Sequence, residues 1–382
     1  MARLTLDWIQ LAAVVGSLQG LLLVGVLFAQ RNNRTANRLL ASLMAAFTLY
    51  LASSVYYAAG LFEVYPHFFG ISYLMPWVFG PLVYLYAVAA SDRSWRFRSR
   101  HLLHFLPVAV VAVTGAPYYM MSGAEKIALY HRLLAGDVPA RIAILEPTKF
   151  LSGITYSVLT ILYLRQHRRR IEDSYSNIAR LNLTWLLWLA GAAAGTWLIA
   201  TLRITEFGQR LREDHVTLAI AVLVYAIGYM GLRQPEVFRY ATAEFAVVKP
   251  EESSAPASRY ERSGLGDDEA EELKKSLLAV MENEHPWKDS ELTLPDLAVR
   301  LNSTPHKLSE VLNRQVGQTF YDFVNDYRVR EVQRRIQAGE ARRLKMLALA
   351  LDAGFASKST FNEAFKKHTN RTPSGFRQAV GG

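Results

Sequence analysis

Long apolar windows that are almost free of charge recur through the first 232 residues of the chain. A helix needs about 20 apolar residues to cross a hydrocarbon core of roughly 30 Å, because backbone amides in lipid are satisfied only internally. The windows of about that length are Trp8–Gln30, Leu39–Phe62, Val64–Ser91, His101–Ala124, Leu181–Leu202 and the shorter His215–Leu232. A further window, Phe150–Leu164, is short, and it extends upstream if the Lys149 ammonium reaches the interface. The pattern predicts an all-α protein that begins with a seven-helix transmembrane bundle over residues 1–232.

Lysine and arginine in the connecting loops set the predicted orientation of these spans. They gather after the first, third and fifth spans, at Arg31, Arg34, Arg38, Arg93, Arg96, Arg98, Arg100, Arg165, Arg168, Arg169, Arg170 and Arg180. The opposite loops mix basic with acidic residues, so the amino terminus is expected outside and the carboxyl terminus in the cytoplasm. A cleaved signal peptide is the alternative for the first window, since Arg3 precedes it. That window is more than twice the length of a typical signal core and ends in arginines, which favours a span.

Candidate chemistry within the spans is sparse. Polar or ionisable residues at membrane depth are costly and often mark a site. Tyr73, Trp77 and His104 are the candidates for a ligand cavity that would take an unknown signal ligand. The alternative is that aromatic residues form interfacial belts while prolines only kink helices. The chain has no cysteine, and it carries no His-Glu-x-x-His, Gly-x-Ser-x-Gly or phosphate-loop pattern. We therefore assign no catalytic residue, no metal ligand and no cofactor, and we expect no enzyme.

The composition changes after residue 232. Residues 249–266 mix Pro, Ser, Gly and alternating charge without an apolar period, so residues 233–266 are predicted to be a flexible linker. Helical spacing resumes over Asp267–Met281, with acidic residues near its start. This helix is expected to pack on the domain that follows, or alternatively to pair two chains in a homodimer.

The last part of the chain, residues 267–382, carries two similar helical patterns. Leu292–Leu301 predicts one helix, and Thr304 predicts the N-cap of a second helix through Val316, with Gly317 closing it in the left-handed conformation. The same order of cap, core, left-handed and cap residues recurs 53 positions later, since Thr304, Leu308, Leu312, Gly317, Thr319 and Phe323 correspond to Ser357, Phe361, Phe365, Asn370, Thr372 and Phe376. The pattern predicts two helix-turn-helix units.

A longer helix, Phe320–Gln337, is predicted between the two units, capped by Thr319 and ending near Gly339. At ~1.5 Å per residue it is roughly 27 Å long. A helix of that length could hold two recognition helices near one turn of DNA apart, about 34 Å, so duplex DNA is the expected partner.

The residues from Met346 to Arg377 resemble the signature of AraC/XylS-type transcription regulators. The resemblance rests on Ala350, Ala353, Gly354, Phe355, Ser357, Ser359, Phe361, Phe365, Lys366, Lys367, Thr372, Pro373, Phe376 and Arg377, and it extends over about the last hundred residues through Asp326-Tyr327-Arg328-Val329. Asn370 stands where a glycine is usual in the family, and Glu363 where an arginine is common. The whole chain resembles the membrane-integrated members of the family, which have seven spans before this domain.

The resemblance places base-reading residues at the exposed start of each recognition helix. These are His306, Ser309 and Glu310 in the first unit, and Lys358, Ser359, Asn362 and Glu363 in the second. Lys can donate to guanine, Asn can pair with adenine and Glu can accept from cytosine, so the chemistry agrees. The residues interpreted as phosphate contacts are Lys307, Arg314, Arg342, Arg343, Lys366, Lys367 and Arg371. An exposed charged face without a nucleic-acid partner is the alternative for both groups.

Together these patterns predict a membrane-bound transcription regulator of the bacterial inner membrane. A seven-span sensor would respond to a signal and alter the tethered DNA-binding domain, with double-stranded DNA, the lipid bilayer and RNA polymerase as partners. The main alternative is a seven-span transporter or receptor whose cytoplasmic tail binds a protein.

Overall fold

A computed structural model describes residues 7–31, 33–92, 94–178, 184–202, 213–233 and 266–381. The chain divides into two compact units. We call Met1–Arg165 with Leu183–Ala243 the apolar unit, and Gln166–Asn182 with Glu244–Gly382 the C-terminal unit. Over the described ranges both units are built from helices without a strand, as the all-α prediction requires. Residues 234–265, which hold most of the predicted linker, lie outside the described residues.

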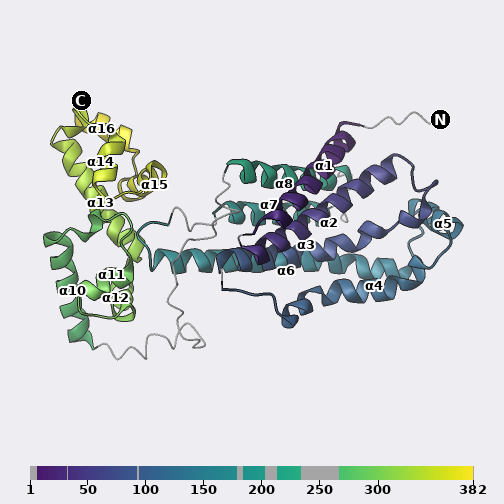
Figure 1. Ribbon diagram of the computed structural model, residues 1–382, viewed down its shortest axis with the longest axis horizontal. Helices are drawn as coiled ribbons and strands as arrows, with labels where there is room; N and C mark the ends of the chain where they lie inside the picture. The colour runs from purple at the N-terminus through teal and green to yellow at the C-terminus, as the bar shows by residue number, and fades with distance from the viewer. Residues whose placement is uncertain are drawn as a thin grey trace. The chain divides into compact units, whose positions relative to one another are not determined.

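Long helices form the apolar unit (Figure 1). They are α1 (Trp8–Ala29), α2 (Arg34–Ala58), α3 (Met75–Ser91), α4 (Leu106–Tyr119), α5 (Gly123–Leu134), α6 (Ala140–Glu172), α7 (Thr184–Leu202) and α8 (Glu213–Arg233), with α6 continuing past Arg165 into the C-terminal unit. The core of the unit is an apolar cluster from α1, α2, α3, α6, α7 and α8, with side chains such as Leu40, Leu85 and Val224 fully buried. Helix α2 lies against α1, α3 and α8, so it is the central element of this bundle.

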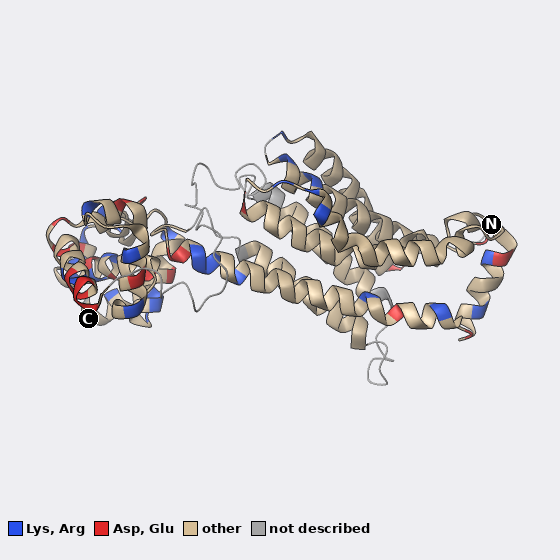
Figure 2. Ribbon diagram, turned by 90° about the horizontal axis from the view of Figure 1, so that it is seen from below, with Lys and Arg blue, Asp and Glu red and all other residues tan. Residues whose placement is uncertain are grey.

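Five helical segments of the described chain are long and apolar enough to cross a membrane by length and composition. They are Trp8–Ala29, Arg34–Ala58, Pro66–Ser91, Ser99–Tyr119 and Trp185–Leu202, and His215–Met230 is a shorter apolar helix. The window predicted at Phe150–Leu164 falls inside α6, which also holds Glu146, Pro147 and Lys149. Figure 2 shows the helices of this unit with little charge along their length and with Lys and Arg mostly towards their ends.

The C-terminal unit contains two separate apolar cores joined by one helix. Its helices are α10 (Asp267–Asn283), α11 (Leu294–Arg300), α12 (Pro305–Val311), continued by a π turn over Leu312–Val316, α13 (Phe320–Gln337), α14 (Met346–Asp352), α15 (Lys358–Thr369) and α16 (Pro373–Gly381). The first half of α13 gives Phe320 and Val324 to a core shared with α10, α11 and α12. The second half gives Val332 and Ile336 to a core shared with α14 and α15. Because α13 belongs to both cores, it fixes the spacing of the two halves.

Local capping chemistry sets the bounds of these helices. Thr304 accepts a hydrogen bond from the Lys307 amide at the start of α12, and Gly317 ends its π turn with φ of 73°. Thr319 caps α13 and Ser357 caps α15, and Asn370 ends α15 in the left-handed region with φ of 55°. Each of these caps is where the sequence pattern predicted it. Helix α11 is shorter than predicted, since Thr293 and Asp296 form a capping box that starts it at Leu294.

Helix α10 packs on the domain that follows it. Leu277 and Met281 are fully buried in the first core, and Leu273 packs with Ala270 and Val311. The expectation that this helix packs on the domain is confirmed, and its apolar face is covered by the chain itself.

Candidate DNA interface and apolar cavity

The first turns of α12 and α15 present polar side chains to solvent. His306 on α12 is exposed, and so are Lys358, Ser359, Asn362 and Glu363 on α15. They protrude because Leu308 in α12, and Phe361 and Phe365 in α15, turn the opposite faces of these helices into their cores. Helices with an exposed polar first turn and a buried far side suit insertion into a DNA major groove.

Two residues predicted to read bases are less open. Ser309 is half-buried, and its carbonyl accepts a hydrogen bond from the Asn313 amide at 2.9 Å. The Glu310 side chain is only 3% exposed, and its carboxylate accepts from the Arg314 guanidinium at 2.7 Å. Glu310 is therefore buried where the sequence interpretation expected an exposed side chain, and its assignment to base reading stays a prediction. The spacing of four residues that puts Glu310 on the helix face also brings it to Arg314.

The residues interpreted as phosphate contacts divide into two groups. Three form ion pairs inside the unit: Arg314 with Glu310, Lys307 with Glu269 on α10 at 2.5 Å, and Lys367 with Asp322 on α13 at 2.6 Å. The others are exposed: Arg342, Arg343, Lys366 and Arg371. A cation that already has a carboxylate partner gains less from a phosphate, so the second group offers the stronger phosphate contacts.

Carboxylates on one side of α13 anchor the end of α15. Besides the Asp322–Lys367 pair, Asp326 lies 3.3 Å from the imidazole Nδ1 of His368 and is also bonded by Arg330. Burial alone would raise the pKa of the Asp326 carboxyl, but hydrogen bonds from His368 and Arg330 outweigh it and lower that pKa below its usual value. The contacts fix α15 to the helix that joins the two cores.

Arg328 is a buried residue that holds several backbone segments together. The sequence patterns include it only as part of a motif. Its side chain is 1% exposed, and its guanidinium donates to the carbonyl oxygens of Trp287 and Asp289, each at 2.7 Å. Burial lowers the pKa of Arg328 to about 10, which leaves it charged at neutral pH. The burial of Arg328 could have been predicted from its position among the apolar residues Val324, Val329 and Val332 of α13.

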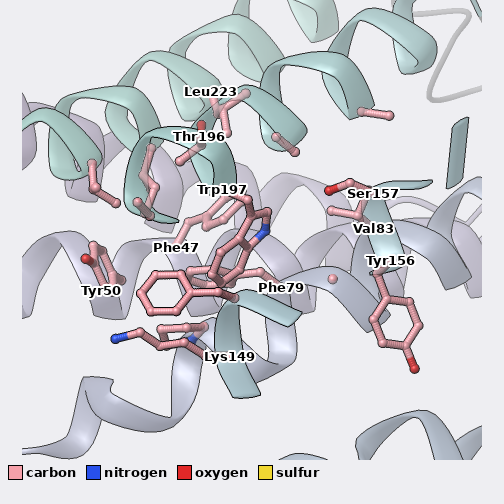
Figure 3. Close-up of a pocket in the computed structure, with 18 residues that line it drawn as sticks. Phe47, Tyr50, Phe79, Val83, Lys149, Tyr156, Ser157, Thr196, Trp197 and Leu223 are labelled. Carbon is pink, nitrogen blue, oxygen red and sulfur yellow. The ribbon is translucent and has the colours of Figure 1, made fainter. Parts of the chain in front are cut away.

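The apolar unit contains a partly open cavity of about 100 Å³ between α2, α3, α6, α7 and α8. Its lining is mostly aromatic and aliphatic, with polar groups from Lys149, Tyr156, Ser157 and Thr196. Figure 3 shows the indole of Trp197 near the middle of this lining. Gly153 on α6 makes room for that indole, because a Cβ there would lie 2.1 Å from it. The cavity can take a small apolar group.

None of the three residues predicted to line a ligand cavity, Tyr73, Trp77 and His104, belongs to the lining of this cavity. His104 Nδ1 is 2.9 Å from the hydroxyl of Tyr156, which does line it. Trp77 is buried and donates from Nε1 to the Thr148 hydroxyl at 3.0 Å, and its ring packs against Tyr73. His104 thus contacts the cavity lining through a hydrogen bond with Tyr156, and Trp77 and Tyr73 contact each other.

Comparison with known proteins defines the class of the carboxyl-terminal region. Residues 297–379 match the family described as "Helix-turn-helix domain". The match takes in helices α12, α14 and α15 and most of α11, and it identifies the region as an AraC-type helix-turn-helix domain, which is a DNA-binding domain of transcription regulators.

One similar protein is the probable transcription factor PqrA of Proteus vulgaris. It is 37% identical over 62 residues, which are 16% of this chain and 48% of that protein. The chain therefore spans about half the length of this curated relative. No solved structure matches the chain.

Proposed function

We propose that the protein is a membrane-bound transcription regulator in which the apolar unit senses a signal and the C-terminal unit binds specific duplex DNA through two helix-turn-helix units. The observation that carries the proposal is the shared helix α13. It joins two cores, and each core presents one helix, α12 or α15, with an exposed polar first turn. Such an arrangement suits two neighbouring major grooves.

The division of roles on the proposed interface follows exposure. His306, Lys358, Ser359, Asn362 and Glu363 would read bases, with Ser309 at the margin of the first unit. The exposed arginines and lysine named above would contact phosphates and add affinity without sequence information. A sequence-specific regulator would also meet RNA polymerase at the promoter, and a second copy of the chain is the further partner expected.

The apolar exterior supports placement in a bilayer. Leu11, Leu18 and Leu22 on α1, and Leu151 and Leu162 on α6, are among the large apolar side chains left exposed. A continuous apolar exterior is costly in water and favourable in lipid. We propose seven spans, with α6 and α8 added to the five segments above, and with the C-terminal unit in the cytoplasm.

The cavity supports a sensing role for the apolar unit. A ligand that fits one conformation of the cavity better than another shifts the population of the two. Helix α6 carries Lys149, Tyr156 and Ser157 of the lining and continues to Glu172. An event at the cavity therefore has a covalent helical path out of the apolar unit.

The test is selection of duplexes from a random library by the full chain in lipid nanodiscs. We expect enrichment of a two-part site with half-sites about one helical turn apart. Recovery of no duplex above random competitor would overturn the proposed DNA binding. A reporter fused after Gly382 tests the membrane part, and a periplasmic reporter would contradict it.

A further inference from the structure

Residues 166–178, which we call the docking segment, pack on the helix-turn-helix region although more than 110 residues separate the segment from α11 in sequence. They comprise the last turns of α6 and the residues that follow. Tyr175 and Thr293 form an antiparallel β-bridge. The Ser176 amide donates to the Leu292 carbonyl at 3.3 Å, and the Leu294 amide donates to the Ser174 carbonyl at 3.0 Å. The segment is therefore held by its backbone, as an added strand would be.

Arg328 on α13 also binds the docking segment, through its side chain. Its guanidinium donates to the Ser176 carbonyl and to the Ser176 hydroxyl, both at 3.2 Å. The Asn325 amide donates to the same carbonyl at 3.3 Å. Ser176 is fully buried, and its hydroxyl donates to the Leu292 carbonyl at 2.7 Å. The Arg328 guanidinium donates to neutral oxygens, and water can take the place of the Ser176 oxygens that accept from it, so this contact can open and close.

Apolar burial adds to the contact. Ile171 and Ile178 of the docking segment are buried against Tyr321 at the start of α13, with Tyr175 at the edge. This cluster is separate from the two cores of the helix-turn-helix region. The region can therefore keep both cores when the segment leaves.

The first residues of the docking segment lie near the proposed base-reading face of α15. A guanidinium nitrogen of Arg168 lies 3.6 Å from the Glu363 carboxylate. Exposed ion pairs of this kind add little stability. The Arg168–Glu363 pair matters because it shows that the end of α6 lies next to Glu363. An α-helix with its side chains is about 10–12 Å across, and the major groove is about 12 Å wide. With α15 in the groove, no room remains for the end of α6 beside Glu363.

We propose that the docking segment is an intramolecular latch that competes with DNA for α15. The inference rests on the proposed DNA-binding function. Docked, the end of α6 lies beside Glu363, where the wall of the major groove would have to pass when α15 reads the bases. Released, it frees the second recognition helix. Because the segment is the end of α6, whose earlier residues line the cavity, a signal there would act on DNA binding by shifting the docking equilibrium.

A disulfide across the β-bridge tests docking directly. Tyr175 and Thr293 form a pair without hydrogen bonds between them, for which Cα atoms lie about 4.5 Å apart, within the range a disulfide spans. The chain has no cysteine, so Tyr175→Cys with Thr293→Cys introduces the only thiols. A protease site is placed within residues 249–266 of the full chain in nanodiscs. After cleavage, a denaturing gel shows whether the two fragments are joined by the disulfide. We expect the fragments to stay joined after cleavage until reductant is added. Separate fragments without reductant would overturn docking, and each single-cysteine variant is the control.

The same variant tests competition with DNA. The probe is the duplex selected by the reduced protein, and each molecule is its own control before and after reduction. We expect at least tenfold weaker binding in the oxidised form, with recovery on reduction. Equal affinity of the two forms would overturn the latch but leave DNA binding intact. If neither form prefers any duplex, the DNA-binding function fails and the latch fails with it, while the gel still reports docking.

A second variant acts in the opposite direction. Ile178→Asp puts a charge into the buried cluster and is expected to release the segment and tighten DNA binding severalfold. Val299→Asp adds the same charge at a side chain that is 75% exposed on α11, and it should change affinity little. Equal effects of the two variants would contradict the latch.

Discussion

A Cβ atom built on Gly354 would lie 2.4 Å from the carbonyl oxygen of Trp287. The turn between α14 and α15 thus passes directly over the backbone that joins α10 to α11, and only glycine fits there. The same Trp287 carbonyl accepts the Arg328 Nε hydrogen bond. One backbone oxygen therefore connects the turn of the second half with the helix shared by both halves.

Gly354→Ala is expected to destabilise the C-terminal unit by about 2–5 kcal/mol. Its φ of 88° costs a residue with a Cβ roughly 1–2 kcal/mol, and the backbone overlap adds about 1–3 kcal/mol. Urea-dependent proteolysis of the full chain in nanodiscs measures the change in unfolding free energy.

Gly317→Ala is the matched control for that substitution. Gly317 also has a positive φ, of 73°, but no atom lies within 4 Å of its Cβ position. Only the conformational cost of about 1–2 kcal/mol should appear. A loss at Gly354 no greater than that at Gly317 would contradict the close approach.

Arg328→Lys is expected to destabilise the C-terminal unit by about 3 kcal/mol. An ammonium cannot serve the carbonyls of Trp287, Asp289 and Ser176 together, and hydrogen bonds to charged groups contribute about 1.5–3 kcal/mol each. Arg334→Lys on the same helix, where the side chain is 65% exposed and pairs with Glu331, should change stability by less than about 0.5 kcal/mol. Comparable losses in the two variants, measured by the same proteolysis, would show that Arg328 does not organise the unit.

The helices of the C-terminal unit could be predicted because their signals are local. Thr304, Thr319 and Ser357 mark helix starts through hydrogen bonds three residues away, and Gly317 and Asn370 mark ends through a backbone angle. Such features are set within one turn of helix, so sequence spacing suffices to find them.

The docking segment could not be predicted because its partners are remote. Ser176 meets Leu292 and Arg328, which follow it by 116 and 152 positions. Dividing the chain into consecutive blocks assigned residues 166–178 to the membrane part, because an arginine run after an apolar window reads as a loop. The burial of the Glu310 side chain could not be predicted for a related reason, since exposure depends on packing that sequence spacing does not define.

The C-terminal unit should lose stability in acid through Asp326. Its pKa is lowered in the folded state, so its contribution is present above its unfolded pKa of about 4 and is lost as pH falls through the lower folded value. Asp326→Asn should be less stable than the parent at neutral pH, and the difference should shrink below about pH 4. Unfolding measured from pH 7 to pH 3 checks this, and a difference independent of pH would contradict the role given to the carboxylate.

Substitutions of base-reading and of phosphate-binding side chains should have different effects on DNA binding. Lys358→Ala and Asn362→Ala remove exposed groups from the first turns of α15, so each should reduce discrimination at one position of the selected duplex by about 1–3 kcal/mol. Arg343→Ala should weaken all duplexes alike and lower the slope of log K against log salt by about 1, because one fewer counterion is released. Titrations of the selected duplex, a single-base variant and a random duplex at several salt concentrations distinguish these effects. If Lys358→Ala and Arg343→Ala weakened all three duplexes equally, α15 would contact the backbone without reading the bases.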